Sequence, residues 1–268
     1  MIESPLGYAK RYRIWSLLVV GVVVFADIFH RFYPRAAMYG AFDDDFFYYA
    51  QVARHLAQGA GSTFDGIHRT NGYHPLWLLC LTVFSLIDSG RLFFPLVTAA
   101  TVLSLGSIFL LSMRILKRLD VEATGCYVIA TLVTFQSELL VRGGMEIVLA
   151  LPLILFLLLA YLDVPRHGDL FFRRAGFLSS LCVLSRLDSV LLVLLLFGLA
   201  FPRSKHVPAA LKSILAFALG LTPVWAYLLL NKAVFGGFSP VSAQAKELRL
   251  HHTPQLEPLR ALVHLGRP

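Results

Sequence analysis

The chain has 268 residues, of which 57% are hydrophobic and only 15% are charged. Soluble globular domains average about 25% charged residues, so this composition excludes an ordinary soluble domain and indicates a membrane protein. The formal net charge of +8 does not indicate nucleic-acid binding, because the basic residues stand in short runs between apolar stretches, as the positive-inside rule arranges them.

Long apolar stretches predict an all-α membrane protein with about seven transmembrane helices, since a spanning helix needs roughly 17–25 mainly apolar residues. The stretch Ala175–Phe201 carries the polar run Ser185–Ser189 at its centre. Two short helices that meet at a polar turn explain it better than one helix with an ion pair at mid-membrane. The other candidates are Ile14–Phe29, Leu92–Met113, Ala123–Val141, Met145–Leu162 and Leu211–Leu230.

Basic residues before the first apolar stretch, Lys10, Arg11 and Arg13, place the N-terminus in the cytoplasm. The alternative interpretation is a cleavable signal peptide. The stretch is long for the apolar part of a signal peptide, and Asp27 lies near its end, so we expect an uncleaved anchor. These features predict a multi-pass protein of the plasma (inner) membrane.

The segment Pro75–Ile87 is apolar but only about 13 residues long, which is too short to cross a bilayer comfortably. If it lies in the interface, every basic cluster further along the chain falls in the cytoplasm, whereas crossing turns most of them outward. We therefore expect an interfacial or re-entrant segment. The clusters concerned are Arg114 with Lys117 and Arg118, Arg166 with Arg173 and Arg174, and Arg203 with Lys205 and Lys212.

This topology gathers the unusual polar groups on the external face. Residues 31–91 form an external first loop with interfacial amphipathic helices, within a single transmembrane domain that covers residues 1–268. The turns Arg142–Glu146 and Ser185–Ser189, and the chain after Asn231, reach the same side. A bundle with only a structural role has no reason to collect its polar groups in this way.

Three adjacent acids, Asp43, Asp44 and Asp45, open the first helix of this loop. Capping of the helix explains one acid, but three neighbouring carboxylates repel one another beside anionic lipids. We interpret them as a general base or as a site for Mg²⁺ or Mn²⁺, which prefer oxygen ligands. The apolar stripe that follows at helical spacing comprises Phe46, Tyr49, Ala50, Ala53 and Ala57.

Turn signals and interfacial aromatics follow the acidic helix. The dipeptide Asn71-Gly72 marks a tight turn. Tyr73 and Trp77 are residue types that favour the membrane interface. His74 stands directly before a proline, and it is either a substrate contact or simply an interfacial residue.

These motifs resemble the external loop of GT-C class glycosyltransferases, polytopic enzymes that use polyprenyl-phosphate-linked sugars. The class includes protein O-mannosyltransferases, aminoarabinose transferases and arabinofuranosyltransferases. Its members are usually longer, with more spans and often an external C-terminal domain, and on this resemblance we expect the chain to be a fragment, a shortened homologue or the product of a degraded gene. The matching segments are Asp44–Arg54, Gly59–Gly61, Thr70–Trp77, Gly144–Glu146, Leu184–Asp188 and Phe238–Ser242 followed by Lys246.

The resemblance implies that an aspartate at the tip of the loop helix is the catalytic base, often near a divalent metal. Setting the register by Tyr49–Arg54 places that role on Asp45, with Asp44 beside it. Asp43 is an extra acid, so the assignment of the base stays open among the three. Glu146 is implied as a second acid or metal ligand together with Asp44 and Asp45, and its alternative role is to offset the helix dipole.

The resemblance also implies a site for the donor phosphate. Lys246, or Arg249 beside it, is expected to bind that phosphate, and a solvated loop charge is the alternative. Arg186 is either part of the phosphate site or a local ion-pair partner of Asp188. The remaining implied substrate contacts are Asn71 and His74.

The expected reaction is therefore transfer of a sugar from a polyprenyl-phosphate donor on the non-cytoplasmic face, with inversion at the anomeric carbon. A divalent cation is expected near Asp44 and Asp45, and membrane lipid surrounds the protein. Two other classes remain as alternatives, a transporter or lipid flippase and a non-catalytic accessory subunit of a glycosylation complex. The sugar and the acceptor are left open.

Overall fold

The computed structural model describes residues 5–32, 39–162, 169–200 and 207–238. In these ranges the chain forms helices, and its only β-type pairing is an isolated bridge between Thr63 and Arg69. The predicted all-α class is therefore confirmed for the described residues. The elements are α1 (Pro5–Phe32), η2 (Tyr39–Ala41), α2 (Asp44–Ala57), α3 (Pro75–Ile87), α4 (Phe93–Arg118), α5 (Ala123–Val141), α6 (Ile147–Leu162), α7 (Asp169–Ser185), η3 (Leu187–Ser189), α8 (Val190–Ala200), α9 (Val207–Gly220) and α10 (Thr222–Phe235).

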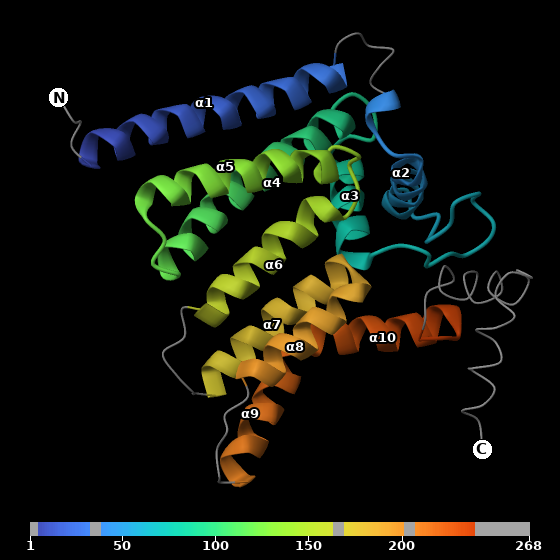
Figure 1. The fold of residues 1–268 in the computed structure, drawn as a ribbon. Coiled ribbons are helices and arrows are strands. Elements are labelled where there is room, and N and C mark those ends of the chain that lie inside the picture. The colour runs from blue at the N-terminus through green and yellow to red at the C-terminus, as the bar shows by residue number, and fades with distance from the viewer. Residues whose placement is uncertain (1–4, 33–38, 163–168, 201–206, 239–268) are drawn as a thin grey trace, which may run out of the picture.

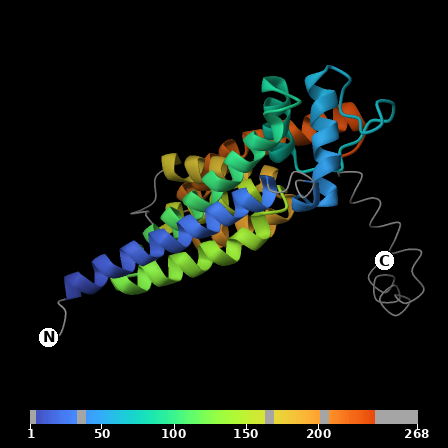
Figure 2. The same cartoon turned by 90° about the horizontal axis from the view of Figure 1, so that it is seen from above.

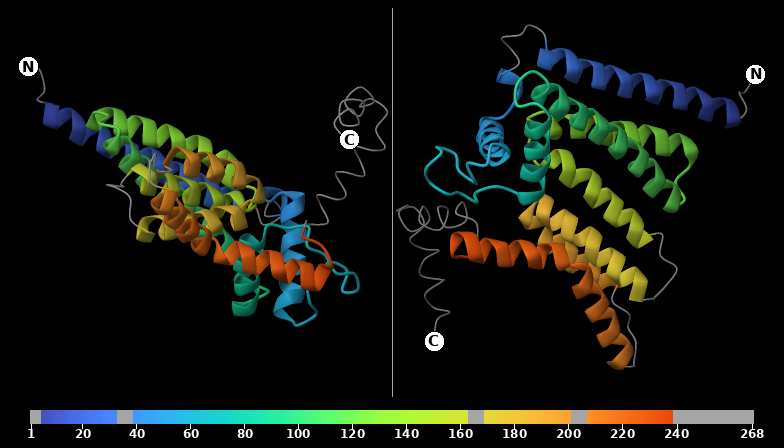
Figure 3. Two further views of the ribbon diagram at one scale, coloured as in Figure 1. Left: turned by 90° about the horizontal axis from the view of Figure 1, so that it is seen from below. Right: turned by 180° about the vertical axis from the view of Figure 1, so that it is seen from behind.

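The long helices lie side by side in one row (Figure 1). Helix α1 packs on α5, α5 on α4, α4 on α6, α6 on α7, and α7 on α9. Helices α2 and α3 run across this row at one end of it, where α10 also lies (Figures 2 and 3). We call this the α2 end. The opposite end, formed by the first turns of α1 and α7 and the last turn of α4, is called the basic end.

Three helices among the described residues are long and apolar enough to cross a membrane. They are Tyr12–Phe29 within α1, Phe93–Arg118 and Ala123–Val141. A fourth candidate is the pair Ala210–Gly220 and Thr222–Phe235, which is bent by 55°. The described chain therefore has three candidate spans, or up to four, and the prediction of seven crossings is wrong.

The remaining apolar helices are too short to count as spans. Helix α3 has 13 residues, as the sequence predicted. Helix α6 has 16 residues, because Met145 and Glu146 belong to the preceding turn rather than to the helix. Helix α8 has 11 residues. The apolar stretches Met145–Leu162, Ala175–Phe201 and Leu211–Leu230 form helices that are shorter than the stretch itself, and this difference explains the overcount.

Two helix breaks divide the C-terminal half. The polar turn predicted inside Ala175–Phe201 is present, because α7 ends at Ser185 and η3 separates it from α8. The second break, near Leu221, was not predicted within Leu211–Leu230. Pro223 stands in the first turn of α10, a position that proline tolerates, but its ring cannot continue the ladder of α9.

Apolar side chains cover the outer surface of the candidate spans. Only 11% of the window Tyr12–Phe29 is buried, and Trp15, Val22 and Phe25 are exposed on it. Exposed apolar surface of this extent indicates a lipid-facing helix. The long apolar helices therefore indicate a membrane-embedded protein.

The largest buried cluster lies at the α2 end. It joins α2, α3, α4 and the start of α6 through fully buried side chains, including Phe46, Val52, Trp77, Leu105 and Val148. Because α2 contributes to this core, the acidic tip of α2 is held in a fixed position by the rest of the bundle.

A second contact fixes α7 against α9. Gly176 of α7 and Gly220 of α9 meet backbone to backbone, and a Cβ at either position would overlap a backbone atom of the other helix. Small residues allow helices to approach this closely, a packing mode common in membranes. The bend after Gly220 therefore starts at a point where α9 is held by α7.

Candidate functional site

The turn between α5 and α6 docks against the start of α2. The backbone N–H of Asp43 donates to the carbonyl oxygen of Gly143 at 3.1 Å, and Nε1 of Trp77 donates to that of Gly144 at 3.1 Å. Gly144 has φ +73°, and a Cβ there would overlap the ring of Phe42, so glycine is required on both counts. This turn sets Glu146 at the entry of α6.

A buried ion pair in α1 supports the same turn. Nε of Arg31 lies 3.1 Å from both carboxylate oxygens of Asp27, one helical turn earlier, and neither side chain is exposed. Nη2 of Arg31 donates to the carbonyl oxygen of Arg142 at 2.7 Å, and the guanidinium lies 4.8 Å from the ring centroid of Phe42. The end of α1 is thereby tied to the α5–α6 turn.

Glu146 is the buried centre of a polar cluster at the α2 end. It is 6% exposed, and its Oε1 accepts a hydrogen bond from Nη1 of Arg186 at 3.1 Å. Nε2 of His74 lies 3.6 Å from the same oxygen. Oε2 of Glu146 is buried and has no hydrogen-bond partner. A buried carboxylate oxygen without a partner is rare and costly in a native structure.

His74 joins the loop to both α2 and η3. Its Nδ1 accepts the backbone N–H of Leu187 at 3.2 Å, so the neutral ring carries its proton on Nε2, facing Glu146. Its backbone N–H donates to the hydroxyl of Tyr49 at 2.9 Å. His74 is therefore a cluster residue rather than only an interfacial one.

Arg186 lies between two acids. Its Nε and Nη2 donate to the two carboxylate oxygens of Asp188 at 3.1 and 2.9 Å, while Nη1 reaches Glu146. The hydrogen bonds from Arg186 lower the pKa of Asp188, and those to Asp188 raise the pKa of Arg186. The local ion pair expected for Arg186 and Asp188 is present. A donor phosphate at Arg186 has to compete with carboxylates for the guanidinium.

The three acids at the start of α2 are exposed. Asp43 stands at the N-cap position but makes no capping hydrogen bond with its side chain. Asp45 lies one turn before Tyr49, on the same face of α2. Burial, and after it the charge of Glu146, raises the pKa of Tyr49, and Asp45 adds to this effect. Tyr49 therefore lies within electrostatic reach of both Asp45 and Glu146.

The expected cation stays a prediction. Within the described ranges, no three His, Cys, Asp or Glu side chains are grouped so that they could hold a metal ion. The structure groups Glu146 with His74 and Arg186. The set proposed from the sequence, Asp44 with Asp45 and Glu146, is thus not assembled as a three-ligand site.

Of two further residues expected to contact the substrate, Asn71 and Lys246, the structure describes only Asn71. Asn71 is buried, and its Nδ2 donates to Oδ1 of Asn231 at 3.0 Å, while Nδ2 of Asn231 donates to the carbonyl oxygen of Phe238. Asn71 therefore anchors the loop on α10, and its role toward a substrate stays a prediction. Lys246 lies outside the described residues.

The sequence did not indicate the contacts that several residues of this region make. Tyr49 was counted only as part of an apolar stripe, although the hydroxyl of a buried tyrosine needs a partner. The pair Gly143-Gly144 precedes Glu146, and two adjacent glycines before an acid at a helix entry signal a close backbone contact. Asn231, at the end of a long apolar run, gave no sign of its partner 160 residues away.

Comparison of the chain with protein-family models, with curated proteins and with solved structures finds no match. The resemblance to GT-C glycosyltransferases therefore stays a hypothesis carried by short motifs. Three of those motifs, Thr70–Trp77, Gly144–Glu146 and Leu184–Asp188, contact one another at the α2 end.

Proposed function

We propose that the chain is a glycosyltransferase that takes a sugar from a polyprenyl-phosphate-linked donor, with its reaction centre at the α2 end. One observation carries this proposal. Glu146, which is buried, is in contact with both His74 of the loop and Arg186 of the α7–η3 turn, three segments that are far apart in the chain. Such a transfer needs acidic and positively charged groups and an imidazole. The α2 end supplies them as Glu146, Arg186 and His74, beside the exposed carboxylates at the start of α2.

The unpartnered Oε2 of Glu146 supports a functional role for the cluster. A purely structural ion pair gains most when every oxygen of its buried carboxylate is hydrogen-bonded. Here one oxygen is paired with Arg186 and the other is not. A hydroxyl group of a sugar substrate would donate the missing hydrogen bond to Oε2.

The proposed reaction has Asp45 as its base. Asp45 takes the proton of an acceptor hydroxyl while that oxygen forms a bond to the anomeric carbon, and the bond from this carbon to the donor phosphate oxygen breaks. The electron pair leaves with the phosphate, whose charge Arg186 offsets. Attack by the acceptor without a protein nucleophile predicts inversion. No step is assigned to a cation, because the described residues do not assemble three ligands.

A transporter is the second candidate class, and the position of the cluster argues against it. Glu146 and Arg186 lie at the α2 end of the molecule, beside the exposed acids that start α2. Transport sites of broken-helix carriers lie near the middle of the bilayer. An acidic helix that runs across one end of the row of long helices (Figure 2) suits an external or interfacial reaction with a lipid-linked substrate better.

The test is sugar transfer by the purified chain in liposomes that contain polyprenyl phosphate, with a panel of radiolabelled lipid-linked sugars. We expect Asp45→Asn to lower kcat by about 10²–10⁴-fold, the range for loss of a general base. Asp43→Asn removes the same charge and is the matched control, because Asp43 lies against Gly143 rather than toward Tyr49. EDTA in a parallel reaction tests the expected Mg²⁺ or Mn²⁺.

Each outcome has a clear meaning. Wild-type transfer by a stably inserted Asp45→Asn variant contradicts the assignment of the base, and loss in Asp43→Asn or Asp44→Asn instead moves that role to the neighbouring acid. Absence of transfer with every donor, from a folded wild-type chain, contradicts the proposed activity.

A further inference from the structure

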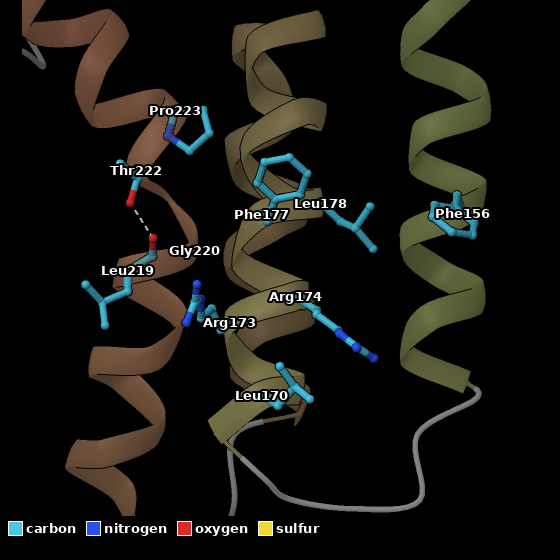
Figure 4. Close-up of a pocket in the computed structure, with 10 residues that line it drawn as sticks. All are labelled: Phe156, Leu170, Arg173, Arg174, Phe177, Leu178, Leu219, Gly220, Thr222 and Pro223. Carbon is cyan, nitrogen blue, oxygen red and sulfur yellow. Dashed lines mark hydrogen bonds between the residues drawn. The ribbon is translucent and has the colours of Figure 1, made fainter.

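A pocket of about 720 Å³ opens between α6, α7 and the bend from α9 to α10 (Figure 4). It belongs to a different part of the molecule from the Glu146 cluster. Arg173, on its wall, precedes Arg186 by 13 positions of the chain, which is roughly 20 Å along a helix axis. The pocket therefore lies toward the basic end, away from the proposed reaction centre.

Two arginines give the pocket its charge. Arg173 and Arg174 both line it and are both exposed, and the described residues that line it include no acid. In Figure 4 Arg173 extends toward Gly220, whereas Arg174 extends toward the helix that carries Phe156. The two guanidinium groups thus lie on opposite sides of α7.

A second basic pocket adjoins the first. Its volume is about 520 Å³, and it shares Phe156 with the first pocket. Three cations of the last turns of α4, Arg114, Lys117 and Arg118, line it. Arg174 of the first pocket and these three cations of the second therefore flank Phe156 from two sides, and their combined field attracts an anion that enters at this level.

The remaining lining of the larger pocket is apolar. Phe156, Phe177 and Leu219 are 43, 50 and 66% exposed, so their side chains face outward beside the arginines. A ligand with a negative head and hydrocarbon chains matches this combination, because the head meets the guanidinium of Arg174, on the Phe156 side of α7, while the chains cover the rings. An inorganic anion alone leaves those apolar surfaces uncovered.

The fold holds the pocket open. Gly176 and Gly220 fix α7 against α9 at its edge, and α10 then turns away by 55°. The hydroxyl of Thr222 donates to the carbonyl oxygen of Leu219 across the bend (Figure 4). The space between α6 and α10 follows from this bend rather than from a loosely placed side chain.

We propose that this pocket binds the phosphodiester head of an anionic membrane glycerophospholipid, with the acyl chains lying on Phe156 and Phe177. Charge complementarity is the reason for this occupant. Basic pockets between membrane helices bind anionic lipid heads, and each Lys or Arg near the surface adds to that attraction. The site is separate from the donor site, so it stands even if the proposed transferase activity fails.

The experiment measures lipid binding to the detergent-purified full chain by native mass spectrometry, with phosphatidylglycerol and phosphatidylcholine of the same acyl chains. We expect wild type to prefer phosphatidylglycerol, and the double variant Arg173→Gln/Arg174→Gln to lose about tenfold or more of that preference. Arg69→Gln/Arg91→Gln removes the same charge from exposed positions before α4 and is expected to bind as wild type does. Arg173→Lys/Arg174→Lys is expected to keep most of the preference.

Three results would overturn the proposal. The first is an unchanged preference in the glutamine double variant, or in Arg174→Gln alone if the double variant does not fold. The second is competition by millimolar inorganic phosphate that equals competition by phosphatidylglycerol, which shows a site for free anions. The third is polyprenyl phosphate that binds there more tightly than phosphatidylglycerol, which shows a donor pocket.

Discussion

Nη1 of Arg186 lies 3.1 Å from Oε1 of Glu146, and this ion pair joins the turn after α7 to the entry of α6. The two residues are 40 positions apart in the chain. The pair therefore holds two separate segments of the bundle together, and its strength can be measured independently of any activity.

A double-mutant cycle tests that strength. We expect Arg186→Gln and Glu146→Gln each to lower the free energy of unfolding by about 1–3 kcal/mol, below the value for a fully buried pair because the side chain of Arg186 is 34% exposed. The double variant should be less destabilised than the sum of the two singles. The measurement is denaturant unfolding in detergent, with the exposed variant Arg91→Gln as control. Strict additivity would show that the two side chains do not interact.

The backbone contact of α7 with α9 predicts an unusual effect of alanine. Alanine normally favours a helix over glycine by up to about 1 kcal/mol. Gly176→Ala is nevertheless expected to destabilise by about 1–3 kcal/mol, because the new Cβ overlaps the carbonyl oxygen of Phe217. Gly106→Ala in α4, where no atom lies near the new Cβ, is the control and should be neutral or stabilising. Thermal unfolding in detergent compares the two, and equal melting temperatures would contradict close helix packing.

The hydrogen bond between the side-chain amides of Asn71 and Asn231 is expected to protect the loop before α3 from proteolysis. Asn231→Ala leaves Asn71 without this buried partner, which costs about 1–3 kcal/mol locally. We expect trypsin to cleave after Arg69, which is exposed, about tenfold faster in this variant. Asn71→Ala should give the same acceleration because it breaks the same bond. Ser107→Ala, which removes an exposed polar group of α4, should not change the rate.

The ion pair of Arg186 with Asp188 predicts a pH dependence of stability. Hydrogen bonds from Arg186 lower the pKa of Asp188 in the folded state, so the pair stabilises the protein above the unfolded pKa of about 3.9. That contribution is lost as the pH falls through the lower folded pKa. Wild type should exceed Asp188→Asn by less than about 1 kcal/mol from pH 5 to 7, since Asp188 is largely exposed. A difference that persists well below the folded pKa would have another origin.

The sequence predicted those features that depend on local pattern. Helix α2 follows from its apolar spacing, and the turn after Ser185 follows from charges that cannot be left inside an apolar helix. The number of spans was overestimated because an apolar stretch of the sequence can include residues that belong to a turn beside the helix. The helix is then shorter than the stretch. The bend at Leu221 lies within a continuous apolar run, so hydropathy alone could not place it.

The sequence identified the residues of the candidate site but not which of them contact one another. His74, Glu146 and Arg186 were all singled out as polar groups in unusual positions, and they meet in one cluster. Which of them pair is set by the packing of α3, α6 and α7, and no local pattern contains that information. The expected grouping of Glu146 with Asp44 and Asp45 assumed that acids gather at a cation, whereas the fold pairs Glu146 with an arginine.

Both charges of the buried pair Asp27–Arg31 belong to α1 itself. During synthesis, α1 can therefore enter the bilayer with its acid and its base already neutralising each other, before any later helix has left the ribosome. The bond from Arg31 to the carbonyl oxygen of Arg142 becomes possible only after α5 has been made. The final docking of α1 on the α5–α6 turn therefore has to wait for the middle of the chain.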